Sequence, residues 1–262
     1  MNINIYPKLK SYQHLLDSFP PVLASQFLPE WYKKNKINNS VITATQKEYI
    51  DLADKTEKFN NKHAKNCPAI QEYLLDGIVI RSWSDIFLSV NKDGSVSWKV
   101  SWGDAANFFG DNPFELISSH ISSQVKDMGL NEVQNYGVLK LNAPFYIETS
   151  PGYGLEFVDP FYHHRRNIKL LPGIVETDKW HEVNFPFEFL YDTKRNTEIT
   201  YTIKAGDPLI MARPRLLDNI DVDLKVNKYS EEFINKQLYN LSLLSSLSNT
   251  WTRYKKFIKG VI

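Results

Sequence analysis

The chain has 262 residues, of which 42% are hydrophobic and 23% are charged, a composition typical of a globular protein that buries a sizeable core. The 31 basic and 30 acidic residues leave a net charge of +1, so the chain lacks the positive excess of a general nucleic-acid binder. A single cysteine, Cys67, excludes an intramolecular disulfide and favours a reducing compartment. Neither a signal peptide nor an apolar run near the roughly 18 residues of a membrane span is visible, so we expect a soluble protein.

The N-terminal third is predicted to form an arm and two helices. Residues 1–45 mix short apolar clusters with prolines and follow neither the helix nor the strand period, which predicts an extended arm over the core. A structural cover is favoured over a partner-binding arm, because its aromatic side chains contribute most when buried. These side chains are Phe19, Phe27, Trp31 and Tyr32. Amphipathic spacing predicts one helix over 45–65, and Pro68 and Gly77 bracket a second.

From residue 78 the hydrophobic period changes to two. The pattern over 78–102 predicts two antiparallel strands joined by a turn at residues 91–94, Asn-Lys-Asp-Gly. Trp83, Trp98 and Trp102 lie within these strands. Alternating aromatic residues usually form a core face, and a stacking platform for a ligand is the alternative.

The middle of the chain is predicted to be β-rich. Residues 103–135 lose the alternation and are interpreted as a loop-rich excursion with a short helix around 113–119. Six further strands, separated by turn residues, are expected at 144–148, 153–158, 168–176, 180–190, 197–203 and 209–213. The turn at 206–208 is expected to lead into an edge strand. Because no crossover helices separate the strands, we predict an antiparallel β-sandwich or barrel.

The domain organisation follows from these elements. Residues 1–76 are interpreted as an arm and helices packed on the core, 77–217 as the β-sandwich, and 218–262 as a C-terminal helical extension, all within one compact domain. Apolar residues from Phe233 to Leu247 give the extension a helical stripe, and its basic end suits a helix C-terminus. An anionic-surface contact is the alternative role of that end.

Three segments carry a resemblance to a known family: PGYGLEFVDP, LPGIVETDKWHEVNFPFEF and IKAGDPLIMARPR, with weaker support from CPAIQEYLLDGIVIRSWSDIF. They resemble an uncharacterised family of cupin-like proteins common in marine tailed phages and in some bacteria, over roughly half of the chain. The resemblance implies a jelly-roll-like fold and a phage or phage-associated origin, and it implies no reaction. Where the family usually ends in an apolar-Pro-Phe-Lys-Arg turn, this chain has Met211-Ala212-Arg213-Pro214-Arg215.

The histidines give one candidate site. A cupin metal centre needs two histidines two residues apart on one strand, and none of the six histidines has that spacing. An irregular site for a divalent metal such as Fe or Zn would use His163 or His164 together with His181, Glu182 and Asp159. A solvated polar loop is the favoured reading of the same residues.

The arginines give the other candidate site. Arg165, Arg166, Arg213 and Arg215 would bind a carboxylate or phosphate if their loop and strand end meet at one rim. Separate surface ion pairs are favoured. Trp83 and Trp98 form a further candidate binding surface, for an anion or a sugar.

The leading hypothesis is a non-catalytic jelly-roll or β-sandwich protein that acts through binding surfaces, as a phage-encoded accessory or virion-associated protein. The expected partners are further copies of the chain or a phage or host protein, in the cytoplasm of a host cell or in the virion. A metal-dependent oxygenase or isomerase of the cupin-like type and an anion or sugar binder are the alternatives. Whether the chain is an enzyme stays open between them.

Overall fold

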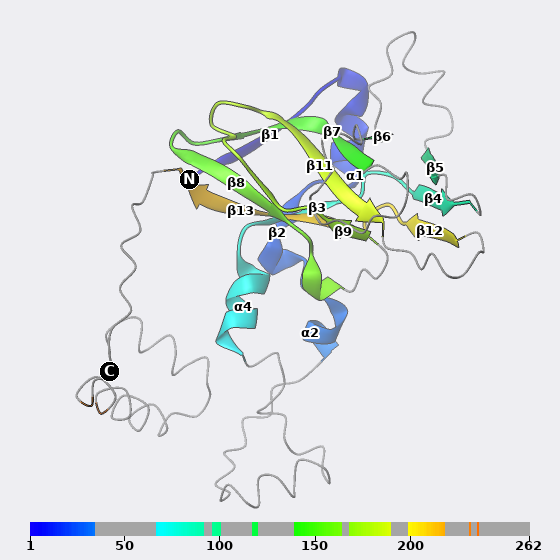
Figure 1. Ribbon diagram of the computed structural model, residues 1–262. Helices are drawn as coiled ribbons and strands as arrows, with labels where there is room; N and C mark the ends of the chain where they lie inside the picture. Colours follow the sequence, from blue (N-terminus) through cyan, green and yellow to red (C-terminus); the bar gives the residue numbers. More distant parts are fainter. Residues whose placement is uncertain are drawn as a thin grey trace, which may run out of the picture. The chain divides into compact units, whose positions relative to one another are not determined.

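The computed structural model describes residues 1–34, 67–91, 96–100, 117–119, 139–163, 168–189 and 199–217, together with Glu231 and Asn235. The chain divides into two compact units. The first contains Met1–Phe27 and Gly77–Asn219, and the second contains Leu28–Asp76 and Ile220–Ile262. The described strands all belong to the first unit (Figure 1). The helix predicted over 45–65 lies outside the described residues, as does nearly all of the predicted C-terminal helix.

The strands form three sheets (Figure 1). Sheet A has the order β1 (Ile3–Pro7), β7 (Leu139–Thr149), β11 (Glu182–Phe189) and β9 (Ile168–Leu170), with β6 (Ile117–Ser119) also paired to β7. Sheet B has the order β10 (Gly173–Val175), β8 (Tyr153–Val158), β13 (Pro208–Leu216), β3 (Ile78–Arg81) and β2 (Val22–Leu23). Sheet C has the order β12 (Ile199–Ile203), β4 (Ile86–Val90) and β5 (Val96–Val100). Every described pair is antiparallel, which confirms the mainly β, antiparallel prediction.

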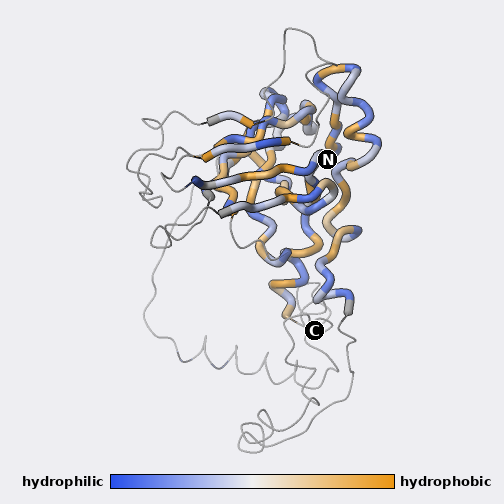
Figure 2. The backbone as a smooth tube through the Cα atoms, turned by 90° about the vertical axis from the view of Figure 1, so that its right-hand side faces the viewer, coloured by the Kyte–Doolittle hydropathy of each residue, from blue (hydrophilic) through white to orange (hydrophobic). Residues whose placement is uncertain are grey.

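One hydrophobic cluster joins sheets A and B. Alternate residues of each strand point into it, among them Phe145 and Ile147 of β7, Phe185 of β11, and Leu155 of β8, all almost completely buried. Figure 2 shows hydrophobic and hydrophilic positions interchanging along the strands. Because successive side chains of a strand point to opposite faces, the intervening residues of sheet A lie on its outer surface.

An irregularity in the pairing of β7 with β11 leaves this alternation intact. Glu182 pairs with Tyr146 and Asn184 pairs with Asn142, so β7 advances four residues while β11 advances two. The two extra residues form a bulge that includes Pro144, whose missing N–H suits an interrupted ladder. An even number of extra residues keeps the odd positions of β7 inward on both sides of the bulge.

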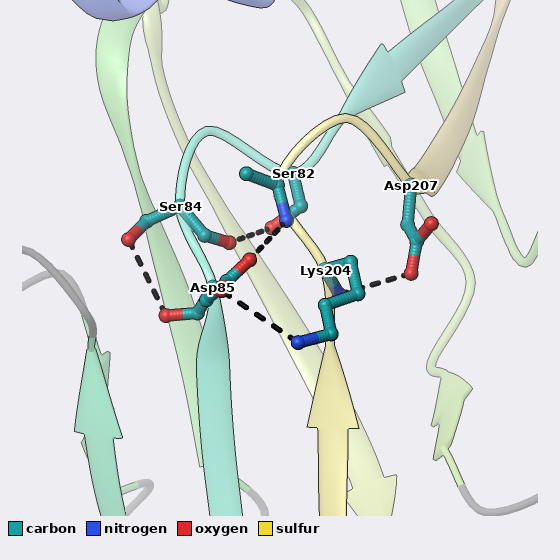
Figure 3. Close-up of polar contacts among 6 residues, drawn as sticks. Ser82, Ser84, Asp85, Lys204 and Asp207 are labelled. Carbon is teal, nitrogen blue, oxygen red and sulfur yellow. Dashed lines mark hydrogen bonds and ion pairs between the residues drawn. The ribbon is translucent and has the colours of Figure 1, made fainter.

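The sequence run 78–90 forms two strands in different sheets, since it turns a corner after β3. At this corner the Ser82 hydroxyl donates to the Ser84 carbonyl oxygen (2.7 Å), and the Ser82 N–H donates to the Asp207 carbonyl oxygen (2.7 Å). The Ala205 N–H donates to Asp85 Oδ1 (2.7 Å). Figure 3 shows Ser82 in contact with Ser84 within the corner, and the Asp85 carboxylate in contact with the turn before β13. The predicted hairpin is present as the β4–β5 pair. Of its predicted turn, 91–94, residues 92–94 lie outside the described residues.

The N-terminal segment is more regular than the extended arm that we predicted. It contains β1, the 3-10 helix η1 (Lys10–Tyr12), α1 (Gln13–Ser18), β2 and η2 (Ala24–Gln26). Tyr12 and Leu15 belong to the core cluster, so the segment completes the core. The predicted anchors Phe19 and Phe27 contact the sandwich: Phe19 lies against Gly206, and Phe27 stacks on His163 with ring centroids 5.7 Å apart.

Three further element predictions are wrong. Residues 117–119 form β6 instead of part of a helix, because Ile117 is buried opposite Leu141 of β7. The run 168–176 forms two short strands, β9 and β10, that pair in different sheets. The strand that follows the turn at Gly206 is central, since β13 lies between β8 and β3. Each outcome depends on pairing partners distant in sequence, which local patterns do not specify.

The second unit contains the described helices α2 (Glu30–Lys34) and α4 (Pro68–Leu75). Helix α4 confirms the predicted helix after Cys67: Pro68 occupies its first turn, and Gly77 follows it with a φ of 75°. None of the helices in the described part of the chain combines the length and apolar character needed to cross a membrane.

Candidate binding face

The outer surface of sheet A carries two exposed tyrosines side by side. Tyr6 of β1 pairs directly with Tyr146 of β7, and Tyr146 pairs with Glu182 of β11. The two tyrosines are 50% and 38% exposed. In the next row of the sheet, Asn4 pairs with Glu148. The Cβ atoms of directly paired residues lie about 5 Å apart, and the three strands together span about 10 Å. We call these five residues the tyrosine face.

Hydrogen bonds hold the Glu148 carboxylate in place. Glu148 Oε2 accepts from Asn4 Nδ2 (3.1 Å) and from the Tyr6 hydroxyl (3.3 Å). All three groups project from the same side of paired strands, so the contacts need no distortion of the backbone. The tyrosine face therefore presents a carboxylate of fixed orientation between an amide and an aromatic ring.

An ion pair fixes the other carboxylate of the face. Lys8 Nζ lies 2.9 Å from Glu182 Oε1 and 5.5 Å from the centroid of the Tyr146 ring. The Lys8 side chain is only 3% exposed, whereas that of Glu182 is 46% exposed. An ammonium group near an aromatic ring contributes about 0.5–2 kcal/mol. Lys8 thus contacts both Tyr146 and Glu182, and the described residues leave the second carboxylate oxygen of Glu182 open.

Several acceptors on the face are available. Glu148 Oε1, Glu182 Oε2 and Asn4 Oδ1 accept no hydrogen bond from the described part of the chain, and the Tyr146 hydroxyl is likewise unengaged there. With two carboxylates and one ammonium, the face is negative at neutral pH. The arrangement suits a ligand that donates several hydrogen bonds and offers an apolar surface to the rings.

The pKa of Tyr6 lies above its ordinary value of 10.0. Partial desolvation of the hydroxyl is the largest cause, followed by the charge of the Glu148 carboxylate and by the hydrogen bond between the two groups. A tyrosinate beside Glu148 would place two negative charges together and would lose the donated proton. The Tyr6 hydroxyl is therefore a neutral donor at physiological pH.

The two candidate tryptophans lie apart from this face. Trp83 follows β3 and is 3% exposed, in the core cluster, with its ring edge-on to Phe145 at a centroid distance of 6.1 Å. Trp98 lies on β5 of sheet C and is 37% exposed. Trp83 is placed as a core residue, and Trp98 alone of this pair reaches the surface.

The candidate metal ligands are not gathered by the described structure. His163 ends η5 (Phe161–His163) after β8, and His181 immediately precedes β11. Figure 1 shows the end of β8 and the start of β11 at opposite ends of the sandwich. His164 lies outside the described residues, and Glu182 is bound to Lys8. No group of three or more His, Cys, Asp or Glu side chains suited to a metal ion occurs among the residues that the structure describes.

Of the candidate arginines, Arg213 and Arg215 lie on β13 in sheet B, two residues apart and on the same side of the strand. Arg215 Nη1 lies 3.6 Å from Glu156 Oε2, and Arg213 is opposite Glu156 in the strand pairing. Arg165 and Arg166 lie outside the described residues. Both described arginines thus face a carboxylate on the neighbouring strand.

Sequence reasoning missed every residue of the tyrosine face except Glu182. The signal was present in the first seven residues, where Ile3 and Ile5 alternate with Asn4 and Tyr6, but the run is short and ends at Pro7. A strand was expected at 144–148, but nothing local shows that its Tyr146 lies beside Tyr6. The pairing joins residues 140 positions apart, so only the assembled sheet brings them together.

Comparisons with protein-family models, with curated proteins and with solved structures found no match.

Proposed function

We propose that the protein is a non-catalytic binding protein with a jelly-roll-like β-sandwich, and that its ligand binds on the tyrosine face. The observation that carries the proposal is the exposed Tyr6–Tyr146 pair, flanked by two restrained carboxylates with open acceptor atoms. Adjacent exposed aromatic side chains with a polar rim are a feature of interaction sites, because they combine apolar contact area with hydrogen-bonding groups. Rigid strands also position side chains more accurately than loops do.

A screen by nuclear magnetic resonance of the uniformly labelled full chain tests this binding role. The probes are neutral oligosaccharides, inorganic phosphate, citrate and Zn²⁺, each added separately. We expect at least one probe to shift the backbone amide signals of β1, β7 and the start of β11 without being chemically converted. Shifts confined to other parts of the chain, or turnover of a bound probe, would contradict the proposal.

The alternative function is that of a metal-dependent enzyme. It requires His163, His164, His181 and Glu182 to converge, and no observation on the described residues favours that arrangement. The Zn²⁺ arm of the screen addresses it directly: signal shifts centred on His163 and His181 would favour the enzyme over the binding protein.

The family resemblance supports a more specific setting for the binding role, as a phage-encoded accessory or virion-associated protein. Mass spectrometry of purified virions of a phage that encodes the chain tests the virion-associated form. Peptides of the chain at a constant ratio to the major capsid protein are expected. Their presence only in the infected-cell extract would leave the accessory role and rule out the structural one.

A further inference from the structure

We propose that the tyrosine face binds a neutral saccharide, an inference that rests on the binding role proposed above. A sugar ring has one surface of C–H groups and a rim of hydroxyl groups. The C–H surface suits an aromatic ring, and the hydroxyl groups need hydrogen-bond partners. The tyrosine face offers both kinds of group within the width of three strands.

The stacking surface is the pair Tyr6 and Tyr146. Their direct pairing across β1 and β7 places the Cβ atoms of the two tyrosines about 5 Å apart on the same side of sheet A. Each ring is between a third and a half exposed, so a ligand covers area that now faces water. Tyrosine supplies large rigid contact area at a low cost in side-chain entropy, which is why it is frequent in binding sites.

The hydrogen-bonding rim consists of Glu148, Glu182 and Asn4. The open oxygens on these side chains, Glu148 Oε1, Glu182 Oε2 and Asn4 Oδ1, are acceptors that match the hydroxyl protons of a sugar. Bonds to carboxylates are roughly twice as strong as those between neutral groups. The carboxylates are already oriented by Tyr6, Asn4 and Lys8, so binding costs little side-chain ordering.

The charge of the face favours a neutral saccharide over an anionic ligand. Two carboxylates and one ammonium give a negative surface, which repels phosphates, carboxylates and nucleic acids. The Lys8 side chain is 3% exposed and its ammonium pairs with Glu182, so the positive charge is not presented to an anion. A neutral ligand rich in hydroxyl groups meets no such penalty.

A broad glycan array probed with the labelled full chain tests the inference, followed by calorimetry on the tightest neutral oligosaccharide. We expect Tyr6→Ala and Tyr146→Ala each to weaken binding about tenfold or more, because each removes a stacking ring. Tyr6→Phe keeps the ring and is expected to weaken binding less. The matched control is Phe161→Ala, which removes a 71% exposed aromatic ring away from the face and should leave the affinity unchanged.

Salt separates this ligand class from anions. Affinity for a neutral saccharide is expected to change less than twofold between about 0.05 and 0.5 M sodium chloride, whereas that for phosphate or citrate falls steeply. If no glycan binds while phosphate or citrate shifts the signals of the face, the saccharide inference is overturned and the binding role stands. If none of the probes affects the face, both fail. Equal loss of binding in Phe161→Ala and Tyr6→Ala would also overturn the inference.

Discussion

Tyr6 links the chemistry of the face to a measurable ionisation. Its pKa is raised, first by desolvation and then by Glu148, so Glu148→Gln is expected to bring the Tyr6 pKa down towards 10.0. The difference in ultraviolet absorbance between the wild-type chain and Tyr6→Phe during alkaline titration isolates the Tyr6 transition. Because the folded-state pKa is the higher one, this group's contribution to stability is present below about pH 10 and is lost as the pH rises through the folded value. An unchanged transition in Glu148→Gln would contradict the arrangement.

Gly77 is required by a close backbone approach as well as by its φ of 75°. A Cβ at this position would clash with the Ala212 carbonyl oxygen. Gly152 has a similar φ, 80°, but a Cβ there would meet nothing within 4 Å, so it is the matched control. Gly152→Ala is expected to lower the unfolding free energy by about 1–2 kcal/mol, from backbone strain alone. Gly77→Ala should cost clearly more.

Urea denaturation of the two glycine variants measures this difference. Equal losses of unfolding free energy in the two variants would show that strain in φ explains both. The Ala212 carbonyl would then be far enough from Gly77 to leave room for a Cβ. A loss in Gly152→Ala larger than in Gly77→Ala would contradict the account of both positions.

At the scale of elements, the corner between β3 and β4 depends on side-chain acceptors. Asp85 Oδ1 receives the Ala205 N–H at 2.7 Å, and Asp207 Oδ2 receives the Lys204 N–H at 2.9 Å. Asp85→Ala leaves a partly buried donor without its partner and is expected to cost about 1–2 kcal/mol of unfolding free energy. Asp85→Asn retains an oxygen at that position and should cost less than half as much.

Thermal or urea unfolding of the two Asp85 variants distinguishes the hydrogen bond from the charge. The Asp85 to Lys204 ion pair is long, at 3.8 Å, and its lysine side chain is 65% exposed, so it contributes little. Equal destabilisation by Asn and Ala would assign the effect to the charge and contradict this account of the corner.

The elements also show what the sequence could and could not predict. Local turn residues were sufficient to predict β8 at 153–158 and α4 between Pro68 and Gly77. Proline fixes φ at the start of an element, and glycine adopts the positive φ that the turn or helix end requires. The runs 78–90 and 168–176 each proved to be two strands in different sheets. A corner such as Ser82–Asp85 depends on contacts with residues 204–207, more than a hundred positions away.

At the scale of the whole molecule, the antiparallel β-sandwich class followed from the alternation and from the absence of crossover helices. The candidate face did not, because its members come from β1, β7 and β11 and share no motif. The candidate sites were predicted at residues 163–166 and 213–215 because histidine and arginine are common in catalytic and anion-binding sites. Tyr6 and Asn4 could not be recognised as candidate binding residues from the sequence, because only the pairing of β1 with β7 places them beside the other residues of the face.

Saturation-transfer NMR on the full chain with the tightest neutral oligosaccharide tests the central claim most directly. Irradiation of the protein's aromatic protons should saturate the C–H protons on one face of a sugar ring most strongly, since those protons rest on Tyr6 and Tyr146. The effect should disappear in the Tyr6→Ala Tyr146→Ala double variant and persist in Phe161→Ala. Full saturation transfer in the double variant would show that the saccharide binds elsewhere, and the tyrosine face would lose its role.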